Sequence, residues 1–173
     1  MLVIFLKRTL WLVVLVAAQM MVFNYIHLFG YATPLPYVYL LLLFPLDSSR
    51  WSVLLWGFVC GLLCDFVSIT PGLGAASMTL TAFFQPLLLR AMAPKDALED
   101  MQASYHTIGG WGYVRYAGIL TLLFALTYFL LLSFSFFHAA DLAISFASSW
   151  LLTLVLCLAM EKVRGRGEVK SEK

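Results

Sequence analysis

One carboxylate stands out in this sequence as a side chain that could do chemistry. Asp65 lies in an apolar stretch, 14 residues after Trp51. An unpaired carboxylate in hydrocarbon is costly, so Asp65 needs a partner group. Two roles fit this position. It accepts hydrogen bonds from amides of the following turn, such as those of Thr70, Gly72 or Gly74, or it contacts a ligand or a partner protein.

Two glycines precede this carboxylate on the same helix face. Gly57, Gly61 and Asp65 are spaced four apart, and Gly57 to Gly61 is a GxxxG pattern. Such a pair lets a neighbouring backbone approach closely, although the pattern also arises by chance in membrane helices. Gly74 then opens a run of small residues after the turn. We therefore predict helix packing at Gly57 and Gly61, and an outer turn around Asp65, Thr70, Gly72 and Gly74.

Catalytic and metal-binding patterns are poorly represented. The cysteines Cys60, Cys64 and Cys157 form no CxxC or Cys/His ligand spacing. An intramembrane aspartyl enzyme needs two carboxylates sharing one site, whereas the two predicted outer-side carboxylates, Asp65 and Asp141, do not sit in the middle of a helix. No GxSxG or phosphate-binding loop is present. We predict no enzyme, no metal site and no cofactor.

The composition identifies the class of protein that must position these residues. Apolar types make up 62% of the 173 residues and charged types 12%, against about 45–50% and about 25% in soluble domains. Too few polar residues remain to cover a water-soluble fold. This excludes a soluble domain, a disordered tail and a secreted disulfide scaffold. An all-α integral membrane protein remains.

Six hydrophobic segments predict six transmembrane helices in one bundle spanning residues 1–161, followed by a basic cytoplasmic tail at 162–173. Segment 2 is short, tilted or partly extended, and Pro86 predicts a kink in segment 4. The leading Met1–Leu6 stretch lies at the interface or lengthens the first helix. The six segments are Thr9–Phe29, Pro34 or Pro36 to Leu46, Trp51–Val67, Gly72–Met92, Tyr116–Phe137 and Ala139–Met160.

The distribution of basic residues predicts the topology. With six crossings, all eleven lysines and arginines fall on one side of the membrane, together with both termini. Basic loops stay in the cytoplasm, so both termini are predicted to be cytoplasmic. The long connection at 93–114 lies on that side, as a surface linker or as a docking site for a cytoplasmic partner. Its aromatic residues and those just after it suit the membrane interface: Tyr105, Trp111, Tyr113 and Tyr116.

Residues 37–92 resemble the rod shape-determining protein MreD family. The resemblance rests on several short patterns in order. These are Phe44-Pro45-Leu46-Asp47, Arg50-Trp51, Gly57, Gly61 to Asp65, Thr70-Pro71-Gly72, Ala75-Ala76, Pro86 and Arg90.

This resemblance implies a non-enzymatic, multi-pass component of the bacterial inner membrane that acts in the cell-elongation complex. The implied partner is MreC, a bitopic protein with a periplasmic domain, through which the chain would scaffold or regulate peptidoglycan synthesis. RodA, a class B penicillin-binding protein and, indirectly, MreB filaments are implied as further members, with no nucleic acid. The family is also similar in fold to the membrane substrate-binding component of energy-coupling vitamin transporters. A component of that transporter type is the alternative function.

Overall fold

A computed structural model of the chain describes residues 2–20, 34–46, 48–68, 70, 72–93, 103–104, 108–133 and 139–171. Within these ranges the regular structure is helical and no strand is present. Three helical spans are long and apolar enough to cross a membrane: Arg50–Ser68, Gly110–Leu132 and Ala143–Arg164. The prediction of an all-helical membrane protein is confirmed at this level.

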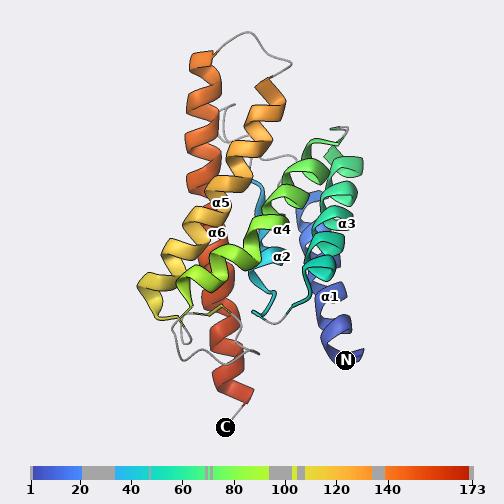
Figure 1. The fold of residues 1–173 in the computed structure, drawn as a ribbon, viewed down its shortest axis with the longest axis vertical. Helices are drawn as coiled ribbons and strands as arrows, with labels where there is room; N and C mark the ends of the chain where they lie inside the picture. The colour runs from blue at the N-terminus through green and yellow to red at the C-terminus, as the bar shows by residue number, and fades with distance from the viewer. Residues whose placement is uncertain are drawn as a thin grey trace.

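The long helices run alternately up and down in Figure 1, with α1, α3 and α6 closer to upright and α4 and α5 slanting across the view. Helix α1 spans Leu2–Ala18, α3 spans Arg50–Ser68, α4 spans Leu73–Met92, α5 spans Gly110–Ser133 and α6 spans Ala139–Ser171. The starts of α1, α3 and α5 lie at the lower end of Figure 1, together with the ends of α4 and α6. Helices α3 and α4 form the most extensive pair, and α4 packs in turn on α5, and α5 on α6.

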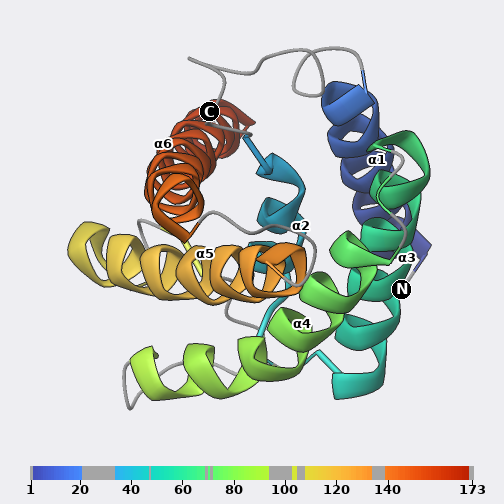
Figure 2. The ribbon, with the colours of Figure 1, turned by 90° about the horizontal axis from the view of Figure 1, so that it is seen from above.

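A short segment occupies the centre of this arrangement. It consists of a 3₁₀ turn, η2, at Pro36–Val38 and the single-turn helix α2 at Tyr39–Leu42. Prolines explain its brevity, because Pro36 suits the first helical position whereas Pro45 disfavours helix in the residue before it. Figure 2 shows α2 surrounded by α1, α3, α4, α5 and α6. Residues 34–44 are all buried, so this apolar segment is the core around which the helices pack.

Local signals account for the limits of α3 and α4. The hydroxyl of Ser49 accepts a hydrogen bond from the amide of Ser52 at 3.3 Å, which satisfies one of the free amides at the start of α3. Between the two helices, Gly72 adopts φ of 80°, a left-handed conformation that glycine adopts without strain. Helix α4 continues through Pro86 to Met92.

Several predicted boundaries differ from the structure. Helix α1 begins at Leu2 rather than Thr9, so the leading apolar stretch lengthens this helix. Helix α5 begins at Gly110, six residues before the predicted start and inside the predicted 93–114 connection. Helix α6 continues through the predicted tail to Ser171. Polar residues next to an apolar run do not by themselves end a helix, and α6 also continues through Gly165 and Gly167, since isolated glycines are tolerated in a helix at a modest cost.

Tyr113 and Tyr116 contradict the interface prediction, because both are fully buried. Trp111 is exposed, as an interfacial residue should be. The end of the first segment at Phe29, most of the 93–114 connection, and Tyr105 lie outside the described residues.

Candidate functional site

Asp65 lies near the end of α3. Its carboxylate accepts three hydrogen bonds that fix the turn between α3 and α4. Its Oδ1 accepts from the amide of Gly74 at 2.7 Å and from the hydroxyl of Thr70 at 3.0 Å. Its Oδ2 accepts from the amide of Ala75 at 2.8 Å. Gly74 and Ala75 are the second and third residues of α4, whose amides have no partner within the helix. A carboxylate from the neighbouring helix therefore caps α4.

The main chain reinforces this cap. The amide of Thr70 donates to the carbonyl of Asp65 at 3.2 Å. Asp65 itself is 7% exposed. The amides and the positive end of the α4 dipole lie against this carboxyl group. The cap thus joins α3 to α4 at one end of the bundle.

The two glycines of α3 bring its backbone against α4. A Cβ added to Gly61 would lie 2.5 Å from the carbonyl oxygen of Gly74 and 2.7 Å from the Cα of Ala75. A Cβ added to Gly57 would lie 2.9 Å from the Cβ of Ala82 and 3.3 Å from the carbonyl oxygen of Met78. No larger residue fits at Gly61 without a backbone shift. We name the contact of Gly61, Asp65, Thr70, Gly74 and Ala75 the α3–α4 joint.

The predicted site residues therefore come together with one exception. Gly61, Asp65, Thr70 and Gly74 meet directly in the joint, and Gly57 lies one turn below Gly61 on the same face. Gly72 contributes backbone geometry, since it is exposed and no atom lies within 4 Å of a Cβ added there. The sequence had allowed amides of Thr70 and Gly72 as donors to the carboxylate. Instead the Thr70 hydroxyl donates, and its amide bonds the main chain.

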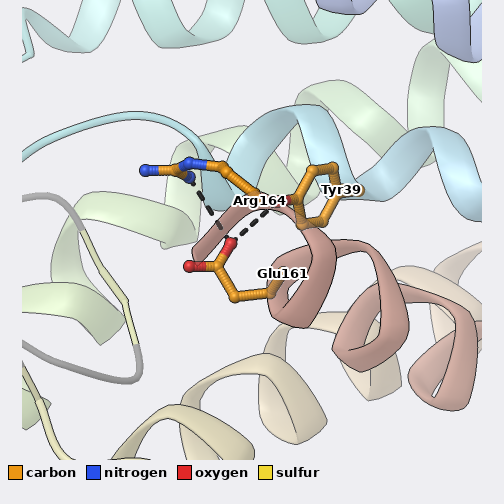
Figure 3. A network of polar contacts seen from close by, with 3 residues as sticks. All are labelled: Tyr39, Glu161 and Arg164. Atoms are coloured by element: carbon orange, nitrogen blue, oxygen red, sulfur yellow. Dashed lines mark hydrogen bonds and ion pairs between the residues drawn. The ribbon is translucent and has the colours of Figure 1, made fainter. Parts of the chain in front are cut away.

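A second buried carboxylate, Glu161, was missed from the sequence. It is 1% exposed on α6, and its Oε2 accepts from the hydroxyl of Tyr39 at 2.7 Å. The guanidinium of Arg164 lies 3.4 Å from the same oxygen. Figure 3 shows the three side chains, with Tyr39 reaching α6 from the central segment. Glu161 thus anchors α2 to α6.

The spacing of α6 contained a signal for this carboxylate. Ser149, Thr153, Cys157 and Glu161 follow one another at intervals of four, and all four are buried. Thr153 also bonds the central segment, since its hydroxyl accepts from the amide of Leu35 at 3.2 Å. Reading this row as one buried face would have placed Glu161 inside the protein rather than at the boundary of a polar tail.

Further polar contacts bind the lower end of the central segment. The amide of Gln85 on α4 donates to the hydroxyl of Tyr116 at 3.0 Å and to the carbonyl of Phe44 at 3.5 Å. The guanidinium of Arg8 lies 4.4 Å from the centre of the Phe44 ring and donates to the hydroxyl of Ser48 at 3.4 Å. These contacts connect α1, α4 and α5 through the segment that all of them cover.

No group of three or more potential metal ligands occurs among the described residues. What the α3–α4 joint can do chemically follows from its bonds. Both oxygens of Asp65 accept hydrogen bonds from the turn and from the first residues of α4, so the carboxyl group is held in place. In comparisons with known proteins, no family model, curated protein or solved structure matches the chain.

Proposed function

We propose that the chain is an MreD-like, non-enzymatic scaffold of the bacterial cell-elongation complex. The observation that carries this proposal is the α3–α4 joint. The three hydrogen bonds that engage both oxygens of Asp65 end on the turn and first residues of α4. A carboxylate used in this way supports a structural role rather than a catalytic one. Most of the patterns that resemble MreD fall on α3, the turn and α4, which supports the same conclusion.

The proposed topology has six crossings with both termini in the cytoplasm. Support comes from the helix ends, because the helix ends nearest Arg8, Arg50, Arg90, Arg115 and Lys162 gather at one end of the bundle (Figure 1). In this arrangement the central segment forms the short second crossing, and α4 is kinked at Pro86 within the fourth. The α3–α4 joint then lies at the periplasmic end.

The proposed partner is a bitopic membrane protein like MreC, which meets the periplasmic end where the joint fixes the turn. Rigid presentation of that turn is the contribution we assign to the joint, because a preorganised surface loses less conformational entropy on binding. RodA, a class B penicillin-binding protein and, indirectly, MreB filaments complete the proposed assembly.

Co-purification from native membranes tests this function. The tagged chain, extracted in a mild detergent, should retain a bitopic periplasmic protein and the glycan-polymerising enzymes. Depletion of the chain should convert rods to spheres. Capture of a cytoplasmic ATPase together with a bound vitamin would instead support the transporter alternative and overturn the proposal. A control variant, Gly118→Ala, should retain the partner, because no atom lies within 4 Å of the added Cβ.

A further inference from the structure

The lower end of the bundle carries exposed basic side chains on four helices. We name the following set the basic band: Arg50 on α3, Arg90 on α4, Arg115 on α5 and Lys162 on α6, each of which is exposed. Two tryptophans lie beside it at the starts of α3 and α5. Trp51 is 83% exposed and Trp111 is 77% exposed, although tryptophan is ordinarily well buried. Both indole rings are therefore available to the surroundings at this end of the bundle.

Contacts between α4 and α5 place their parts of the band at one level. Gln85 bonds Tyr116 at 3.0 Å, and the two helices run in opposite directions. Arg90 follows Gln85 by five residues and Trp111 precedes Tyr116 by five, so both lie about 7 Å further down. Arg115 lies about one turn above them, within reach of a long side chain that extends toward water.

The other two cations of the band, Arg50 and Lys162, lie on α3 and α6. Gly57 packs against Met78 and Ala82, so Arg50, seven residues earlier, lies opposite the turn of α4 that precedes Arg90. The indole of Trp150 on α6 donates to the carbonyl of Gly118 at 3.3 Å. Lys162, twelve residues later, therefore lies about one turn beyond the start of α5. By these spacings the four cations occupy a zone about two to three helical turns deep.

Charge at this level is uncompensated among the side chains that the structure describes. The acid there, Glu161, is buried and paired with Tyr39 and Arg164. Exposed cations next to exposed indoles are the chemistry that a phospholipid interface accommodates. Indoles prefer the headgroup level, and lysine and arginine are attracted to anionic lipids.

We propose that the basic band, with Trp51 and Trp111, binds the anionic headgroups of phospholipids. This inference rests on the membrane placement in the proposed function. It goes beyond it by naming a lipid class and the residues that select it. A preference of about fivefold or more for an anionic over a zwitterionic lipid is expected. One basic residue near an anionic membrane surface already contributes a factor of about five.

Tryptophan quenching by brominated lipid tests the proposal. The chain is reconstituted in phosphatidylcholine vesicles containing either brominated phosphatidylglycerol or brominated phosphatidylcholine at equal mole fraction. Stronger quenching by the glycerol lipid is expected, and added salt should weaken the difference. The combined variant Arg50→Gln, Arg90→Gln, Arg115→Gln, Lys162→Gln should lose the preference. Trp51→Phe with Trp111→Phe should remove most of the selective quenching, whereas Trp150→Phe should leave it.

Equal, salt-insensitive quenching of the unmodified chain by both lipids overturns the inference. That result would show that other groups, such as Asp96, Glu99 and Asp100, neutralise the band. The salt titration uses the unmodified chain. Misfolding of the fourfold variant therefore cannot be used to explain a negative result. Partner capture from native membranes is measured in parallel. Loss of capture with the lipid preference intact would overturn the proposed function alone.

Discussion

At the scale of single residues, the Asp65 carboxylate fixes the end of one helix to the start of the next. Both of its oxygens are needed, because the N-cap residue of α4 is Gly72, which has no side chain to cap the helix. The amides of Gly74 and Ala75 would otherwise lack acceptors in a buried position. A buried donor left without a partner costs more than the net gain from an average hydrogen bond.

Asp65→Ala should lower the free energy of unfolding by about 1–3 kcal/mol, because it leaves the two α4 amides without acceptors. Asp65→Asn should lie between this variant and the unmodified chain. Its amide oxygen can serve Gly74 and Thr70, while its NH2 group faces the donor of Ala75. Unfolding in mixed detergent micelles, followed by tryptophan fluorescence, measures the order. Equal stability of Asp65→Ala and the unmodified chain would contradict the cap.

Gly61→Ala should destabilise the fold by about 1–3 kcal/mol, because its Cβ meets backbone atoms of Gly74 and Ala75 rather than movable side chains. Gly118→Ala is the matched control on α5, where no atom lies within 4 Å of an added Cβ. The same unfolding titration compares the two. If both variants unfold alike, the close approach of α3 to α4 is not a determinant of stability.

Sequence reasoning succeeded at Asp65 and failed at Glu161 for a physical reason. Asp65 interrupts a long apolar run, so its burial and its need for nearby donors were evident. Glu161 follows the run and is followed by Lys162 and Arg164, which makes it look solvated. Its burial depends on Tyr39, 122 residues away, and a pairing across that distance leaves no local pattern. Only the four-residue spacing with Cys157 indicated the buried face.

At the scale of elements, the central segment is the part that the sequence described least well. Its prolines predicted a short helix, and α2 is indeed a single turn. Its position inside a ring of helices could not be predicted, because the eight consecutive apolar or aromatic residues 37–44 suit a lipid-facing helix and a protein core equally well. Tertiary contacts decide between them. The same ambiguity explains why Tyr113 and Tyr116 were assigned to the interface.

The anchor between α2 and α6 predicts a non-additive pair of substitutions. Tyr39→Phe removes the donor to Glu161 and should cost about 1–3 kcal/mol. Glu161→Gln should be milder, because a neutral amide still accepts the tyrosine hydroxyl. In the Glu161→Gln background, Tyr39→Phe should cost roughly half as much, since a bond to a neutral acceptor is weaker. A double-mutant cycle of unfolding free energies measures this coupling. Additive costs would mean that the two side chains do not interact.

At the scale of the whole molecule, the alternating helix directions and the one-sided basic residues support the proposed membrane orientation. Length and hydropathy identify α3, α5 and α6 as candidate spans, while the crossings by α1, the central segment and α4 rest on charge distribution. Cysteine labelling on a background without Cys60, Cys64 and Cys157 tests them. Lys162→Cys should react with an impermeant maleimide only after the membrane is opened. His138→Cys, in the predicted outer connection, should react in intact cells. The reverse pattern would invert the topology.

Asp65 also provides the most direct test of the central claim, which is that this carboxylate acts as a structural cap in a scaffold. Cells that produce only the Asp65→Ala or the Asp65→Asn variant are compared with cells that produce the unmodified chain. Cell shape, partner capture and the amount of folded protein in the membrane are measured. We predict that shape and capture follow the amount of folded protein, with Asp65→Asn nearer to the unmodified chain. A contradiction would be normal amounts of folded, partner-bound protein in both variants together with loss of rod shape. That result would assign Asp65 a chemical role, because asparagine keeps the shape of the side chain but does not titrate.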